Sequence, residues 1–177
     1  YSKAMAFTGF DEGYVTHMDG HVNYAAGYFN QNPFPTESYI FNHEMNDSIR
    51  NVRYDSVRVL MNEGLGFINY TGHGSATSWL ETGINNTFAA AMTNNSRYPL
   101  VISNACLTAK FNDNNCIGSA MVRAADKGAL AFIGCTNDSY WDEDYYWSVG
   151  AGAFIDNPSY EETGLGFYDR LFHLNGE

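Results

Sequence analysis

The sequence predicts an α/β fold built on a mainly parallel sheet. Three short apolar runs, at residues 65–71, 100–104 and 129–134, each end in small or polar residues, which is typical of buried strands. Helix-like stretches separate these runs, and this alternation favours a parallel sheet covered by helices on both faces. Apolar residues make up 45% of the chain and charged residues only 16%, so the composition is that of a folded domain rather than a disordered one.

The other expected elements follow from the hydrophobic periodicity of the sequence and from the glycines that end helices. They are a strand at Ala4–Gly9 and helices at Tyr24–Asn30, Ser48–Glu63, Thr87–Asn94 and Ile117–Lys127. Gly64 and Gly128 follow two of these helices and supply the left-handed residue that ends a helix at little energetic cost. From residue 148 onward the pattern has no clear period, and we expect mostly loop there.

Charge and hydropathy exclude two classes of partner. The formal net charge is −11 and no Lys/Arg cluster is present, so we expect no nucleic acid partner. An acidic field attracts cationic ligands, although solubility explains the same charge simply. No apolar run approaches the ~20 residues of a membrane span, and we expect no spanning segment. The start lacks an initiator Met and a signal-peptide pattern, which suggests a chain excised from a longer precursor.

Cysteine and histidine spacing gives no metal site. Three cysteines form no CxxC pair and leave an odd count, so we expect at least one free thiol and no disulfide framework. His17 and His21 flank Asp19 at a spacing that suits a metal on a helix, but Gly20 argues against a helix there and no third ligand is evident. We therefore predict no metal ligands.

A histidine and a cysteine follow two neighbouring apolar runs. His73 comes after the first run, and Cys106 follows the next, 33 residues later. Parallel strands present such residues at one edge of the sheet. A thiol peptidase needs this pair, since the thiolate attacks and the histidine protonates the departing amine. The backbone N–H groups of Gly74 and Cys106 are candidates for an oxyanion hole. Singly, each side chain is more often structural; together they favour catalysis.

Three longer motifs carry a family resemblance: NYTGHGS at residues 69–75, NACLTA at 104–109 and NDSYWDEDYYWSVGA at 137–151. They resemble the clan CD cysteine peptidases, which include caspases, legumain and gingipains, and are most similar to the lysine-specific gingipains. The resemblance is densest from about residue 65 to 155. It implies a caspase-like α/β/α sandwich with a mainly parallel sheet.

The resemblance also implies catalytic roles. Cys106 would be the nucleophile of an acyl-enzyme mechanism, and His73 the general acid. The residue that orients the histidine would be Asp11, after the first strand, with Glu12 beside it as an alternative. Ala105 stands where the lysine-specific enzymes have a second cysteine, which leaves activity unaffected because alanine is common at this place in the clan.

The lysine-specific relatives close their specificity pocket with an aspartate that matches Asp144. Trp141 would line the pocket, and Thr71 and Asn104 would supply polar contacts. Without the resemblance, the acidic run at residues 142–144 is better explained as a surface loop. These assignments imply cleavage of protein or peptide substrates after a basic residue, with lysine favoured over arginine.

Two alternatives stay open. Arginine-specific relatives place their pocket acid before the histidine motif; the stretch His21–Gly27 holds no acid, but Asp19 lies close enough to keep arginine in view. The other alternative is a non-catalytic homologue that binds cationic peptides or glycans and uses the chain's three tryptophans as stacking platforms, namely Trp79, Trp141 and Trp147.

Gingipain-like organisation would make residues 1–177 a single catalytic subdomain of a secreted or bacterial cell-surface enzyme. No cofactor is expected. A structural calcium ion is left open with no residue assigned to it, because the helix at Cys116–Val122 lacks an acidic residue.

Overall fold

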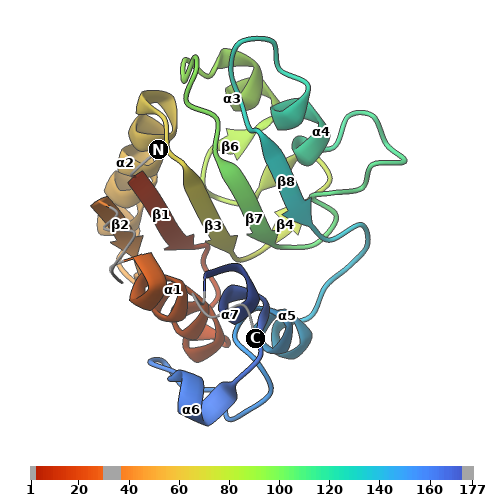
Figure 1. Ribbon diagram of the computed structural model, residues 1–177. Coiled ribbons are helices and arrows are strands. Elements are labelled where there is room, and N and C mark those ends of the chain that lie inside the picture. The colour runs from red at the N-terminus through yellow and green to blue at the C-terminus, as the bar shows by residue number, and fades with distance from the viewer. Residues whose placement is uncertain (1–2, 30–36, 173–177) are drawn as a thin grey trace.

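The computed structural model describes residues 3–29 and 37–172. Its centre is a five-stranded, all-parallel sheet with the strand order β2-β1-β3-β7-β8 (Figure 1). The strands are β1 (Lys3–Thr8), β2 (Glu37–Phe41), β3 (Phe67–Thr71), β7 (Leu100–Asn104) and β8 (Ala131–Gly134). A small antiparallel sheet consists of β4 (Gly74–Ser75), β5 (Ser78–Trp79) and β6 (Ile84–Asn85). The predicted parallel sheet is confirmed.

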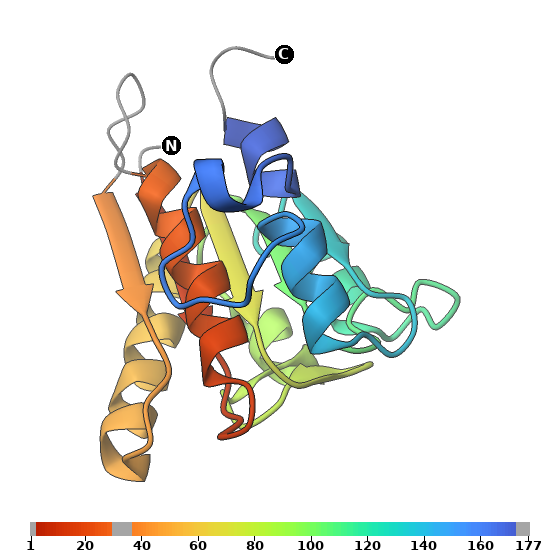
Figure 2. The same cartoon turned by 90° about the horizontal axis from the view of Figure 1, so that it is seen from below.

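Helices cover both faces of the sheet (Figure 2). One face carries α1 (Val15–Phe29), α5 (Trp141–Ser148) and α7 (Phe167–Phe172), and the other carries α2 (Asp47–Glu63), α3 (Asn86–Ala91) and α4 (Ile117–Val122). A single turn, α6 (Tyr160–Thr163), lies in the segment between α5 and α7. Within the described residues, no helix is long and apolar enough to cross a membrane.

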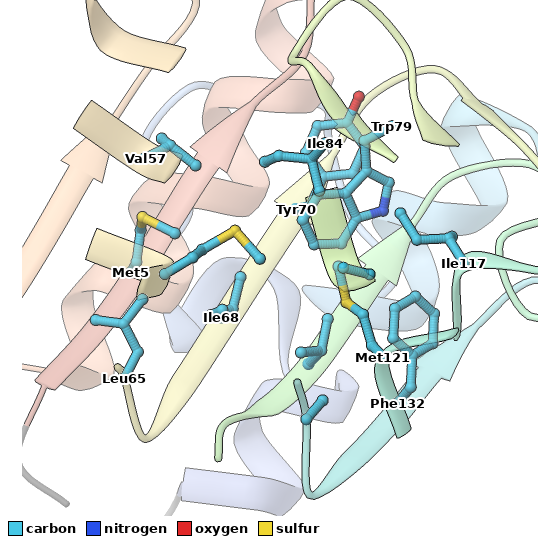
Figure 3. Packing of buried hydrophobic residues seen from close by; sticks show 14 of the residues in the cluster. Met5, Val57, Leu65, Ile68, Tyr70, Trp79, Ile84, Ile117, Met121 and Phe132 are labelled. Atoms are coloured by element: carbon cyan, nitrogen blue, oxygen red, sulfur yellow. The ribbon is translucent and has the colours of Figure 1, made fainter. Parts of the chain in front are cut away.

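Successive side chains along the strands point to opposite faces of the sheet, and this builds two apolar cores. In β1, Met5 and Phe7 pack into the core beneath α2, whereas Ala4 and Ala6 belong to the core beneath α1. On the α2 side, the Tyr70 ring stacks on Trp79 with centroids 4.7 Å apart, so the small sheet is tied to the large one (Figure 3). Burial of large side chains on both faces fixes the strand register, because a slip of one residue would turn every side chain to the wrong face.

Helix α1 begins well before the expected start at Tyr24, and Gly20 lies inside it. The argument from Gly20 against a helix was wrong for a reason of packing. A Cβ on this residue would lie 2.6 Å from both the Ile155 carbonyl oxygen and the Tyr145 ring. Glycine destabilises a helix by about 1 kcal/mol relative to alanine, but at this position it permits close contact between α1 and α5.

Other boundaries differ from the expectation in smaller ways. Helix α3 ends at Ala91 and α4 at Val122, each several residues early, and β2 was not expected. The segment from residue 148, expected as mostly loop, contains α6 and α7. Asn30, the expected end of the first helix, lies outside the described residues.

The register of the sheet brings three strand ends together. Thr8 pairs with Thr71, and Thr71 pairs with Asn104. Loops that leave β1, β3 and β7 therefore start side by side, at the carboxyl edge where ligands bind in open α/β sheets.

Candidate active site

Three neighbouring strand ends deliver Asp11, His73 and Cys106 to the same edge of the sheet. Two backbone hydrogen bonds continue the strand pairing past the sheet: Gly9 N–H donates to the Thr71 carbonyl at 2.8 Å, and Gly72 N–H donates to Asn104 at 3.1 Å. The loops that carry these three side chains are therefore fixed relative to one another at their bases.

The His73 imidazole is held from two sides. Its Nε2 lies 2.9 Å from the Asp11 carboxylate, whose other oxygen accepts from the Gly13 N–H at 2.8 Å. Trp141 packs edge-on against the imidazole at 5.4 Å. With Nε2 facing the carboxylate, Nδ1 is the nitrogen left for proton exchange. The structure thus brings together the predicted histidine and aspartate, whereas Glu12 is exposed.

The Cys106 thiol is partly buried, and Ser139 lies beside it. The sulfur lies 3.4 Å from the Ser139 N, 3.5 Å from its carbonyl oxygen and 3.8 Å from its hydroxyl oxygen. Gly74 packs directly against the cysteine's backbone: a Cβ there would lie 2.7 Å from the Cys106 carbonyl oxygen and 2.9 Å from Ala105 Cβ. Only glycine permits this approach, which brings the histidine loop against the cysteine loop.

Two backbone donors lie next to this pair of loops. Leu80 N–H donates to the His73 carbonyl at 3.0 Å, so the adjacent Gly74–Trp79 pair is a non-hydrogen-bonded pair of the antiparallel ladder. The Gly74 N–H is accordingly directed away from β5. Within the described residues, the Cys106 N–H also makes no hydrogen bond. Both donors are available, and their role in an oxyanion hole stays a prediction.

A cavity of about 320 Å³ lies at the carboxyl ends of β7 and β8. Its lining residues are Ser103, Asn104, Ile133, Gly134, Cys135, Glu143, Asp144 and Trp147. Burial raises the pKa of the Asp144 carboxyl to about 6. Its carboxylate lies 3.8 Å from the Cys135 sulfur, and none of the described Lys, Arg and His side chains forms an ion pair with it.

Two of the four predicted substrate contacts line this cavity and two lie elsewhere. Asn104 and Asp144 line it. Thr71 is fully buried, and its hydroxyl lies 3.0 Å from His21 Nδ1. Trp141 stacks on Tyr14 at 5.1 Å, beside a separate hollow. Substrate binding by these four residues stays a prediction.

Sequence reasoning missed three residues here. Trp147 lines the cavity but was considered only as a sugar platform, and Cys135 and Ser139 were given no role. The sequence signal for Trp147 is its place six residues after Trp141 in the aromatic motif, and α5 places it at the cavity. No sequence signal marks Ser139, since its contact with Cys106 depends on tertiary packing.

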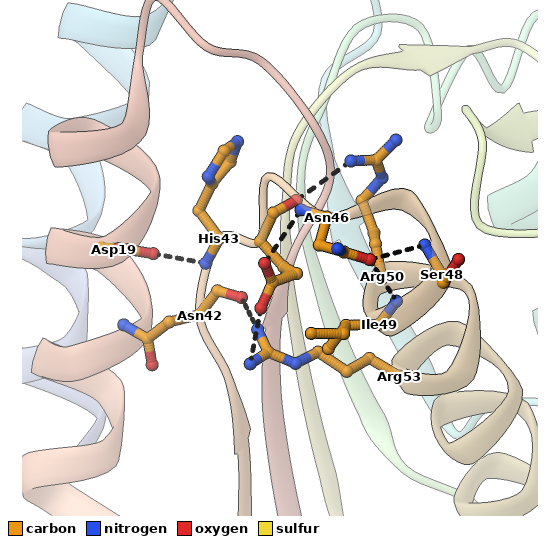
Figure 4. A network of polar contacts seen from close by, with 9 residues as sticks. Asp19, Asn42, His43, Asn46, Ser48, Ile49, Arg50 and Arg53 are labelled. Carbon is orange, nitrogen blue, oxygen red and sulfur yellow. Dashed lines mark hydrogen bonds and ion pairs between the residues drawn. The ribbon is translucent and has the colours of Figure 1, made fainter.

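The spacing of His17, Asp19 and His21 serves structure. His17 Nε2 lies 3.0 Å from the Asp142 carboxylate, and Asp19 accepts from the His43 N–H at 2.7 Å (Figure 4). His21 is fully buried, and burial lowers its pKa to about 3, so it is neutral. Across residues 3–29 and 37–172, no three His, Cys, Asp or Glu residues gather as a metal site. All three cysteines are free thiols.

Comparisons with known sequences agree on one protein family. Residues 2–176 match Peptidase family C25. Lys-gingipain HG66 of Porphyromonas gingivalis is 49% identical over 114 residues, which are 63% of this chain and 7% of the relative. Gingipain R2 of Porphyromonas gingivalis (strain ATCC BAA-308 / W83) is 33% identical over 85 residues, which are 45% of this chain and 12% of the relative. The chain therefore spans only a small part of these relatives.

Solved structures agree on the fold. A protease structure superposes with a TM-score of 0.85 at 35% identity, covering 97% of this chain and 37% of that chain. The Arg-specific cysteine proteinase gingipain R superposes with a TM-score of 0.67 at 23% identity, covering 81% and 34%. The second likeness speaks for the fold alone, and it confirms the caspase-like α/β/α sandwich. Matched over nearly all of its length, this chain belongs to Peptidase family C25, with the gingipains among its relatives.

Proposed function

We propose that this chain carries the active site of a cysteine endopeptidase that cleaves after basic residues, lysine above all. One observation carries the proposal: the half-buried Asp144 carboxylate lines a cavity next to the nucleophile loop and has no cationic partner among the described residues. Buried charges in proteins are normally paired. An extended ammonium group would supply the missing charge, and the apolar walls at Ile133 and Trp147 would contact its methylenes.

The proposed reaction proceeds through an acyl-enzyme. The Cys106 thiolate attacks the scissile carbonyl carbon, and the resulting oxyanion accepts hydrogen bonds from the Gly74 and Cys106 N–H groups. Collapse breaks the C–N bond while His73 donates a proton to the leaving amine. A water molecule then attacks the thioester and releases the carboxylic acid and the free thiol. Asp11 keeps the imidazole oriented throughout. No cofactor takes part in this scheme.

Two observations favour lysine over arginine. Identity to Lys-gingipain, 49% over 114 residues, exceeds identity to Gingipain R2, 33% over 85 residues. Asp19 is the acid that could recognise an arginine substrate. Its carboxylate accepts a hydrogen bond from the backbone of His43, and this bond joins α1 to the segment after β2 (Figure 4).

No observation favours the glycan-binding alternative. Trp79 is fully buried in the core, where its indole N–H donates to the Ser103 hydroxyl at 2.8 Å, so its ring cannot stack on a sugar. By likeness to the gingipains, we further propose that the enzyme is secreted or held at a bacterial cell surface and that proteins with exposed basic residues are its substrates.

The test is hydrolysis of three matched peptide substrates that differ only in the residue before the scissile bond: lysine, arginine or norleucine. The complete protein under reducing conditions should cleave the lysine substrate fastest. Cys106→Ala should abolish cleavage, whereas Cys116→Ser, which changes a buried thiol at the far end of the same connection and keeps an N-cap acceptor for α4, should retain it. A folded, reduced protein that cleaves none of the three would overturn the proposal.

A further inference from the structure

Ser139 presents three polar groups to the nucleophilic sulfur. Its backbone N, carbonyl oxygen and hydroxyl oxygen all lie within 3.8 Å of Cys106 Sγ. Ser139 comes from the loop between β8 and α5, so the contact joins chain segments 33 residues apart.

These three groups suit both protonation states of the cysteine. In the thiol form, the S–H group donates to the Ser139 carbonyl oxygen at 3.5 Å. In the thiolate form, the sulfur accepts from the Ser139 N–H at 3.4 Å, and the hydroxyl can rotate to donate as well. Because hydrogen bonds to a charged partner are the stronger ones, donors at this position favour the reactive form.

The loop that carries Ser139 is anchored to the nucleophile loop. Leu107 N–H donates to the Asn137 carbonyl at 3.0 Å, and Ala109 N–H donates to the Cys135 carbonyl at 2.9 Å. These two bonds align residues 135–139 alongside residues 106–109. The backbone therefore holds residue 139 beside the sulfur, and this position keeps the serine hydroxyl 3.8 Å from Cys106 Sγ.

Ser139 also influences the acid of the cavity. Its side chain lowers the pKa of the Asp144 carboxyl against the effect of burial, and it lowers the pKa of the Cys135 thiol in the same way. Cys135 in turn lies 3.8 Å from Asp144. The loop after β8 therefore places Ser139 at the reacting sulfur and Cys135 at the carboxylate expected to bind the substrate cation.

We propose that Ser139 is a further positioning residue of the catalytic site, which holds the Cys106 sulfur for attack. This inference rests on the proposed peptidase function and deepens it, because it names the residue that positions the nucleophile. It predicts that the hydroxyl affects the chemical step more than it affects substrate affinity.

The experiment compares Ser139→Ala and Ser139→Thr in the complete protein. Loss of the hydroxyl should lower kcat for the lysine substrate about five- to tenfold while KM changes less than about twofold. The rate of Cys106 alkylation by iodoacetamide, followed by mass spectrometry, should fall in parallel. Threonine keeps the hydroxyl and should restore most of both rates. Thr136→Ala, an exposed hydroxyl lost from the same loop, should change neither.

A second readout separates positioning from a merely structural role. Ser139 lowers the pKa of the Asp144 carboxyl. In Ser139→Ala, the preference for the lysine over the norleucine substrate should therefore begin to fall at a higher pH than in the wild type. Ser139→Thr should restore the wild-type pH dependence. Unchanged kcat, alkylation rate and pH limb in Ser139→Ala would overturn the inference while leaving the peptidase function intact. Failure of the wild type to cleave would instead reject the function, and the alkylation rates would still test the contact.

Discussion

Two aspartates lie at the carboxyl edge of the same sheet, in opposite electrostatic situations. Asp11 has its partner within the chain: its carboxylate bonds to His73 Nε2 at 2.9 Å and to the Gly13 N–H at 2.8 Å. Asp144 is half-buried and lines a cavity of about 320 Å³, and the neutral Cys135 thiol lies 3.8 Å from its carboxylate. Burial raises the pKa of Asp144 to about 6.

Under the proposed function, this difference separates a carboxylate that orients the histidine from one that binds the substrate. A paired acid near the surface contributes geometry, and its own stabilising effect is small. An unpaired acid that is largely removed from water destabilises the folded chain, and a cationic ligand that pairs with it offsets much of that cost. The proposed recognition of a substrate ammonium group uses this property of Asp144.

The largest expected effect is on recognition. Asp144→Asn keeps the size of the side chain and removes its charge, so a bound lysine would lose its buried partner at a cost of about 4 kcal/mol. We expect kcat/KM for the lysine substrate to fall about a thousandfold. The norleucine substrate should change little, and a similar loss for both substrates would mean that Asp144 supports the fold instead of recognition.

The same substitution should stabilise the folded chain. Because the folded-state pKa of Asp144 lies above its usual value, the unfolding free energy falls as pH rises through about 6, and Asp144→Asn removes that loss. We expect a gain of up to about 3 kcal/mol at pH 7.5 that vanishes toward pH 4, measured by urea unfolding. No gain at pH 7.5 would indicate that the carboxylate has a partner after all.

Removal of the charge on Asp11 should have a smaller and different consequence. In Asp11→Asn, the imidazole keeps a neighbour of the same shape but loses a charge-assisted hydrogen bond, worth about 1–2 kcal/mol at a half-exposed histidine. We expect kcat to fall about tenfold for the lysine and norleucine substrates alike. A loss confined to the lysine substrate would contradict the division between the two acids.

An effect of similar size is expected in the pH dependence of the wild type. Below pH 6, Asp144 becomes neutral and can no longer attract an ammonium group. The ratio of kcat/KM for lysine over norleucine should therefore fall about tenfold from pH 7 to pH 5, reporting on the free enzyme. In Asp144→Asn, the ratio should be flat across this range, and a wild-type ratio that is equally flat would argue against Asp144 as the titrating group.

The fold was largely predictable because local patterns and tertiary packing agree. Apolar runs ending in polar residues located four of the five strands of the main sheet, and Gly64 marked the end of α2. Prediction failed where packing overrides propensity, as at Gly20, whose missing side chain lets α1 approach α5. It also failed at the short helices α6 and α7, where the aromatic residues follow no period that a sequence reveals.

The site residues also fall into those that the sequence predicts and those that it does not. His73 and Cys106 directly follow strands, so the parallel topology alone places them at one edge. Asp144 was assigned through resemblance, since an acidic run by itself does not distinguish a buried carboxylate from a surface loop. Ser139 could not be assigned, because its contact with the sulfur arises only when the loop after β8 pairs with the loop after β7.

The most direct test of the central claim, that Asp144 directs a basic residue to Cys106, is covalent trapping. Two peptidyl chloromethyl ketones that differ only in a terminal lysine or norleucine would be incubated with the complete protein, and the modified residue identified by mass spectrometry. We predict that the lysine reagent labels Cys106 at least about a hundredfold faster than the norleucine reagent, and that Asp144→Asn abolishes this difference. Equal labelling by both reagents, or labelling at a residue other than Cys106, would contradict the account.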